Sequence, residues 1–166
     1  NITNSLHTDL HEIAGHGSGK LLPNVNTDTL GVYYSTIEET RADLVALYYM
    51  ADPKLKEFNI YDDAVNVEQA ALAQYVSYLT NGAFGQLRRV ELGNDLTQAH
   101  FRNRQLISLW VLQNSDSSKV SLCVHDGLHY VEVHDINYVR NQFGKLLSEI
   151  QRIKSTGDLN AAKDLV

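Results

Sequence analysis

The sequence predicts a mainly α-helical domain that carries one small β-hairpin. Apolar residues recur at spacings of three and four through most of the 166 positions, as on the buried face of a helix. Only the stretch from Val120 to Val133 alternates like two strands, around a turn at Asp126-Gly127. The hydrophobic content of 43% is sufficient for one core, and no repeat or linker divides the chain. We therefore expect residues 1–166 to form a single domain.

The N-terminal part is expected to form one helix followed by a long loop. The helix runs from about Thr3 to His16, where the cluster of glycines from Gly15 to Gly19 ends it. Residues 21–34 contain proline, asparagine and glycine and are expected to be irregular.

Two further helices are expected in the first half of the chain. One begins at Ser35 or Thr36 and ends before Pro53, because the residue preceding a proline is disfavoured in a helix. The next runs from near Asp62 to about Leu79, and Asn81-Gly82 is a typical stop signal. Its core-facing side chains are expected to be Val65, Leu72, Val76 and Leu79.

The second half is expected to contain helices on both sides of the hairpin. A short helix covers 84–91, and a longer one, capped at Asn94 or the next residue, runs to Gln113. After the hairpin, Asp135 caps a long amphipathic helix that ends at Gly157, and a short helix completes the chain.

Charge and composition exclude several classes of partner. The 14 Lys and Arg residues against 20 Asp and Glu give a formal net charge of −6, so no broad positive field is available for nucleic acid or anionic lipid. No apolar run is long enough to cross a bilayer, and the first residues given lack the charged and apolar regions expected of a secretion signal. The single cysteine, Cys123, excludes an intrachain disulfide and is compatible with a reducing compartment such as the cytoplasm.

The segment His11-Glu12-Ile13-Ala14-Gly15-His16 is the zinc-peptidase pattern H-E-x-x-H with one residue added. In a regular α-helix, residues five apart point about 140° away from each other. If the helix widens locally to i→i+5 bonding, the two imidazoles converge again. The glycine before the second histidine gives the backbone the freedom for such a bulge. We therefore expect a π-helical turn that brings two metal ligands together.

A catalytic zinc site needs a third protein ligand beside two histidines, and Glu38-Glu39 in the next helix offers it. One of the two carboxylates would bind the metal while the other hydrogen-bonds a ligand imidazole, and Asp43 could orient its neighbours in the same way. A competing interpretation is a capping box over Thr36 and Glu39, in which Glu39 would only reach back to the start of its own helix.

These two motifs resemble those of the dipeptidyl peptidase III family, H-E-x-x-G-H followed by E-E-x-R-A-D/E. The resemblance implies that His11, His16 and Glu39 bind one zinc ion, that Glu12 is the general base and that Glu38 is a partner of a ligand. It departs from many members at Thr40, where they have cysteine, at a position that is not a ligand.

A third segment supports the resemblance, since residues 98–104 look like the family's Q-A-H-x-x-x-R helix. This similarity implies that His100 stabilises the transition state and that Arg104 contacts substrate. The competing interpretation is an ordinary helix-surface histidine and a solvated arginine. Residues 154–158 also resemble a stretch near the end of the family's catalytic lobe.

The resemblance implies a zinc metallopeptidase that releases dipeptides from the N-termini of short peptides. Family members have two lobes, so we expect residues 1–166 to be a catalytic-lobe fragment whose partner is the missing lobe. Two alternatives remain open: a zinc-stabilised domain without catalysis, and a metal hydrolase that acts on a non-peptide amide.

Overall fold

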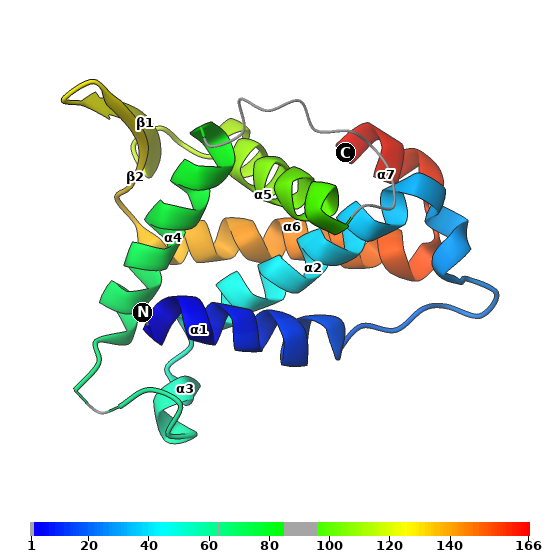
Figure 1. Cartoon of the computed structure of the whole chain (residues 1–166), viewed down its shortest axis with the longest axis horizontal. Helices are drawn as coiled ribbons and strands as arrows, with labels where there is room; N and C mark the ends of the chain where they lie inside the picture. Colours follow the sequence, from blue (N-terminus) through cyan, green and yellow to red (C-terminus); the bar gives the residue numbers. More distant parts are fainter. Residues whose placement is uncertain (1, 63, 85–95) are drawn as a thin grey trace.

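The computed structural model describes residues 2–62, 64–84 and 96–166 (Figure 1). Helices dominate, and the only sheet in the described ranges is a two-stranded antiparallel hairpin, which confirms the predicted fold class. In chain order the elements are α1 (Ile2–Asp9), η1 (Leu10–His16), η2 (Thr27–Tyr33), α2 (Tyr34–Tyr49), α3 (Lys54–Glu57), α4 (Val67–Phe84), α5 (Leu96–Gln113), β1 (Val120–His125), β2 (Leu128–Val133), α6 (Ile136–Thr156) and α7 (Leu159–Leu165).

Helix α2 is the central element of the domain. It packs against η1, α5 and α6, and Figure 1 shows it crossing the middle of the molecule between α1 and α6. Its apolar side chains Leu44 and Leu47 lie in the main core with Phe143 of α6. Because neighbours surround α2, its polar residues Glu39, Thr40, Arg41 and Asp43 are buried as well. A buried polar group requires hydrogen-bond partners, so these side chains indicate a polar site inside the domain.

The first helix changes from α-helical to π-helical geometry at Leu10. Residues 10–16 form the π-helix η1, which confirms the widened turn predicted from the spacing of the two histidines. Gly15 lies against α2 so closely that a Cβ there would come within 2.8 Å of Cα and Cβ of Ala42. The glycine is therefore required by the close approach of η1 to α2 as well as by the bulge.

Helix α4 differs from its prediction at both ends. Its start is at Val67 and not near Asp62, because Asp62 bonds within a turn and Asn66 instead accepts a hydrogen bond from the backbone N–H of Gln69. The expected stop at Asn81-Gly82 is wrong, since the helix continues to Phe84. At Gly82 a Cβ would lie 2.1 Å from Oγ of Ser108, so this glycine permits close packing of α4 against α5.

The core-facing side of α4 is also shifted from the predicted one. Leu79 is buried as expected, whereas Leu72 and Val76 are only partly buried. Tyr75 and Tyr78 are buried and direct their hydroxyls to partners on α2, namely the backbone oxygen of Leu47 and the carboxylate of Asp43. Long tyrosines thus cover the polar side of α2, a contact that apolar periodicity does not reveal.

The C-terminal half follows the prediction closely. The hairpin pairs Val120 with Val133, with Asp126 and Gly127 at positive φ in the turn. Asp135 caps α6 by accepting a hydrogen bond from the backbone N–H of Tyr138, and α6 ends at Thr156 with Gly157 as its C-cap. The second helix, α2, also ends before Pro53 as expected.

Two short elements were not predicted, the 3₁₀ helix η2 inside the expected loop and the four-residue helix α3. Of the expected helix over 84–91, Phe84 is the last residue of α4, and the remainder lies outside the described residues, as does the cap at Asn94 or Asp95. Within the described ranges, no helix combines the length and the apolar character needed to cross a lipid bilayer.

Candidate metal centre

Three side chains from η1 and α2 converge on one point. Nε2 of His11 lies 3.1 Å from Nε2 of His16 and 3.2 Å from Oε2 of Glu39. Nε2 of His16 lies 3.8 Å from Oε1 of Glu39. The π-helical turn of η1 brings the two imidazoles together, and the packing of α2 on η1 supplies the carboxylate. In the part of the chain that the structure describes, these residues form the one group of three or more His, Cys, Asp or Glu side chains close enough to share a metal ion.

The donor set fits a zinc ion. Ligand atoms about 2.0–2.1 Å from a tetrahedral ion lie about 3.3 Å from one another, close to the separations seen here. Each histidine directs Nδ1 to a carboxylate, so both Nε2 atoms present lone pairs to each other. Two lone pairs at 3.1 Å repel unless a proton or a cation lies between them. Oε2 of Glu39 is buried and receives no hydrogen bond of good geometry from the described residues, which also fits a cation at this point.

His11 is held by a buried carboxylate with uncharged partners. Its Nδ1 lies 2.7 Å from Oδ1 of Asp43, while Oδ2 of Asp43 accepts hydrogen bonds from Tyr78 at 2.6 Å and from Asn103 at 2.8 Å. Burial would raise the pKa of Asp43, but its hydrogen bond with His11 and its other partners lower it. The carboxylate therefore stays charged and fixes the tautomer and direction of the His11 ring.

His16 is held by a carboxylate that two cations share. Its Nδ1 lies 3.0 Å from Oε1 of Glu38. The same carboxylate accepts two hydrogen bonds from Arg41 and one from Nζ of Lys154 at 2.6 Å. Burial alone would raise the pKa of Glu38, but the hydrogen bonds from Arg41, Lys154 and His16 lower it to about 2.

Burial, on its own, would lower the pKa of His11. The hydrogen bond to Asp43 and the contact with Glu39 outweigh burial and raise it to about 10. In the absence of a metal, His11 is therefore protonated at neutral pH, and the proton occupies the position that a cation would take.

The predicted base and the other predicted site residues lie around this cluster. Glu12 follows His11 directly on η1, is exposed, and makes no hydrogen bond or ion pair with the described residues. His100 on α5 is 44% exposed and places Nδ1 3.2 Å from Oε2 of Glu39. Arg104, one turn further along α5, is exposed and lines a small groove together with His7 and Tyr78.

The alternative capping box is not present. Helix α2 begins at Tyr34, so Thr36 lies inside the helix, where its carbonyl accepts the hydroxyl of Thr40. The side chain of Glu39 instead faces His11 and His16.

Several supporting residues were not found from the sequence. Tyr78, Asn103 and Lys154 contact the carboxylates that hold the two histidines, although they come from three other helices. Lys154 begins the segment 154–158 that resembles the family but had no assigned role, although a lysine that follows Ile153 on the apolar face of α6 requires a partner. Asn103 lies within the segment noted for His100 but had no assigned role.

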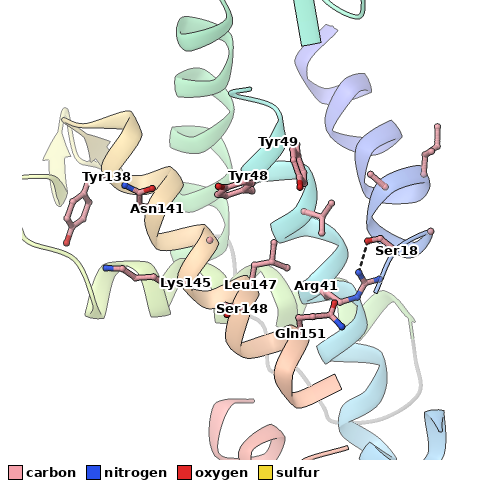
Figure 2. A pocket seen from close by; sticks show the side chains of 15 residues that line it. Ser18, Arg41, Tyr48, Tyr49, Tyr138, Asn141, Lys145, Leu147, Ser148 and Gln151 are labelled. Carbon is pink, nitrogen blue, oxygen red and sulfur yellow. Dashed lines mark hydrogen bonds between the residues drawn. The ribbon is translucent and has the colours of Figure 1, made fainter. Parts of the chain in front are cut away.

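A cavity of about 1070 Å³ lies between η1, α2 and α6 (Figure 2). Tyr48, Tyr49 and Leu147 line it, and Arg41 reaches across its end to donate a hydrogen bond to Ser18. None of His11, His16 and Glu39 lines this cavity, so its size does not bear on the metal centre.

Comparison with known proteins places the chain in a family. The family model described as peptidase family M49 matches residues 26–166, which include Glu38, Glu39 and His100 but not the segment 11–16. The solved structure of DPP III from Caldithrix abyssi has the same fold, with a TM-score of 0.69 and 22% sequence identity. The match covers 98% of this chain and 28% of that one, so the chain spans under a third of the length of that protein. Because the family model matches most of its length, this chain belongs to peptidase family M49.

Proposed function

We propose that this chain is the catalytic domain of a zinc-dependent peptidase that releases dipeptides from the N-termini of short peptides. The observation that carries the proposal is the convergence of Nε2 of His11, Nε2 of His16 and the carboxylate of Glu39, beside an exposed Glu12. Membership of a peptidase family supports the reaction class. Within the proposal, the dipeptide product rests on the resemblance, the single-domain organisation on the composition and the lack of an internal linker, and a cytoplasmic location on the single cysteine.

The number of ligands favours an enzyme over a zinc-stabilised structural domain. Structural zinc sites are closed by four protein ligands, whereas catalytic sites use three and leave a position for water. The described residues supply three donors. Glu12 carries no structural hydrogen bond within the described ranges, so its carboxylate is available to a reacting water.

The roles of the residues follow from their positions. When bound, zinc would lower the pKa of a water molecule toward about 7 and polarise the scissile carbonyl. Glu12 accepts the proton of the attacking water and passes it to the leaving amine. His100, whose partly exposed side chain lies beside Glu39, donates a hydrogen bond to the oxyanion. Asp43 and Glu38 hold the ligand imidazoles in one tautomer.

Peptide binding would need more surface than this chain provides. The relative of known structure is much longer than the region it shares with this chain. We propose that a second lobe supplies the residues that hold the peptide's free amino group and excludes water on closure. Arg104, on the same helix as His100, would contact the substrate.

The test replaces Glu12 with glutamine in the protein that contains these residues. We expect zinc content to stay at one ion per chain, while kcat falls by about 10²–10⁴-fold, the usual contribution of a general base. The matched control is Glu57→Gln on the exposed helix α3, which should change neither quantity. Full activity in Glu12→Gln, or no zinc in the unaltered protein, would refute the proposed function. Hydrolysis of a non-peptide amide but of no peptide would instead support the alternative of a metal hydrolase that acts on such amides.

A further inference from the structure

Lys154 is a buried lysine on α6 whose ammonium group contacts Glu38, the carboxylate that holds the candidate metal ligand His16. Its Nζ lies 2.6 Å from Oε2 of Glu38, and both side chains are largely shielded from solvent. Glu38 in turn holds Nδ1 of His16. A residue far along the sequence is thus two contacts away from the metal centre.

The geometry of Glu38 does not require Lys154. A carboxylate offers about four acceptor positions, and Arg41 fills one on each oxygen, with Nη2 at 2.8 Å from Oε1 and Nε at 3.1 Å from Oε2. This two-point contact fixes the plane of the carboxylate without a third donor. Arg41 is itself held by the carbonyl of Gly15 at 2.6 Å and by Ser18. Removing Lys154 should therefore leave Glu38 and His16 in place.

The charge balance does change with Lys154. Glu38 carries one negative charge against the two positive charges of Arg41 and Lys154, whereas Asp43 on the other side has the uncharged donors Tyr78 and Asn103. Two cations compete with the His16 ring for the charge of Glu38. His16 is consequently the weaker of the two histidine ligands.

We propose that Lys154 is a positioning residue that acts through Glu38 to weaken the hold of His16 on the metal. The inference rests on the proposed function, because it requires that His16 binds a metal ion. Loss of Lys154 should therefore strengthen metal binding. Loss of a purely structural contact would instead weaken metal binding or leave it unchanged.

The experiment measures zinc affinity by competition with a chromogenic chelator at one fixed pH. Lys154→Met, which keeps the length of the side chain without its charge, is expected to bind zinc roughly three- to tenfold more tightly than the unaltered chain. Lys154→Arg should restore the original affinity. Lys145→Met removes the same charge from an exposed position earlier on α6 and should change the affinity much less.

Two further measurements locate the effect at His16. In a Glu38→Gln background, Lys154→Met should change zinc affinity little, because the carboxylate charge through which Lys154 acts on His16 is already absent. With cobalt in place of zinc, the visible absorption of Lys154→Met should differ from that of the unaltered chain, while that of Lys145→Met should not. If Lys154→Met does not fold, Lys154→Gln takes its place with the same expected direction.

The outcomes separate this inference from the proposed function. No zinc binding by the unaltered chain would overturn both. Zinc binding by the unaltered chain, with equal or weaker binding by Lys154→Met or its Gln replacement, would overturn only the role of Lys154. Equal tightening by Lys145→Met would also overturn it, because the effect would then be a general one of net charge.

Discussion

The two histidines of the candidate metal centre are supported in different ways. On the His11 side, the imidazole and Asp43 are buried, the other hydrogen-bond donors to Asp43 are uncharged, and the contact of Nδ1 with Asp43 is short at 2.7 Å. The His16 side is wetter, with the imidazole 30% exposed and a longer contact of 3.0 Å to Glu38. The carboxylate that holds His11 also accepts hydrogen bonds from the uncharged donors Tyr78 and Asn103, whereas the carboxylate that holds His16 is shared with the cations Arg41 and Lys154. The comparison teaches that similar histidines in one motif can be ligands of unequal strength, because other helices set their environments.

The largest expected effect concerns the proton on the His11 side. Because the pKa of His11 is raised to about 10 without metal, zinc must displace a proton at any lower pH. Zinc affinity should therefore fall as pH falls, by about tenfold per unit and about a hundredfold between pH 9 and pH 7. Chelator competition across that range measures the slope. An affinity that does not change with pH would show that His11 is neutral without metal.

Next in size is the acid sensitivity of the His16 side. The pKa of Glu38 is lowered to about 2, so its contribution to stability is present above the unfolded value near 4.5 and is lost as pH falls toward about 2. Between pH 6 and pH 3 the loss should be about 2 kcal/mol. Urea unfolding of the metal-free chain and of Glu38→Gln at both pH values isolates this contribution. An equal pH dependence in the two proteins would contradict it.

A smaller effect is expected when Asp43 loses its charge. Asp43→Asn should weaken zinc binding by about 20-fold, within the usual range for residues that hold a metal ligand. The buried position and the short contact make Asp43 the stronger support. Asp164→Asn on the exposed side of α7 is the matched control and should bind zinc normally.

The smallest effect should follow from Glu38→Gln. The contact with His16 is longer and partly exposed, so we expect zinc affinity to fall less than about fivefold. If Glu38→Gln weakened zinc binding more than Asp43→Asn, the ranking of the two histidines would be reversed.

Most of the fold could be predicted because its signals are local. The cap at Asp135, the glycine at position 157 and the turn at Asp126-Gly127 each fix their own backbone. The π-helical turn could be predicted for the same reason, since it follows from a five-residue spacing beside a glycine. Gly82 was misinterpreted because it serves a contact with α5, which is distant in sequence.

The candidate site was predictable only where its motifs are compact. His11, Glu12 and His16 lie together in the short π-helix η1, and Glu39 lies in the second turn of the next long helix, α2. Tyr78, Asn103 and Lys154 come from α4, α5 and α6, so only the packing of those helices on α2 brings them to the site. Residues that adjust a site from a distance leave little local pattern in the sequence.

The most direct test of the metal centre is anomalous scattering at the zinc absorption edge from crystals grown with zinc. The predicted result is one peak about 2.0–2.2 Å from Nε2 of His11, Nε2 of His16 and an oxygen of Glu39, with water as the further ligand. A peak bound to other residues, or a His16 ring turned away from His11 with no peak between them, would contradict the account.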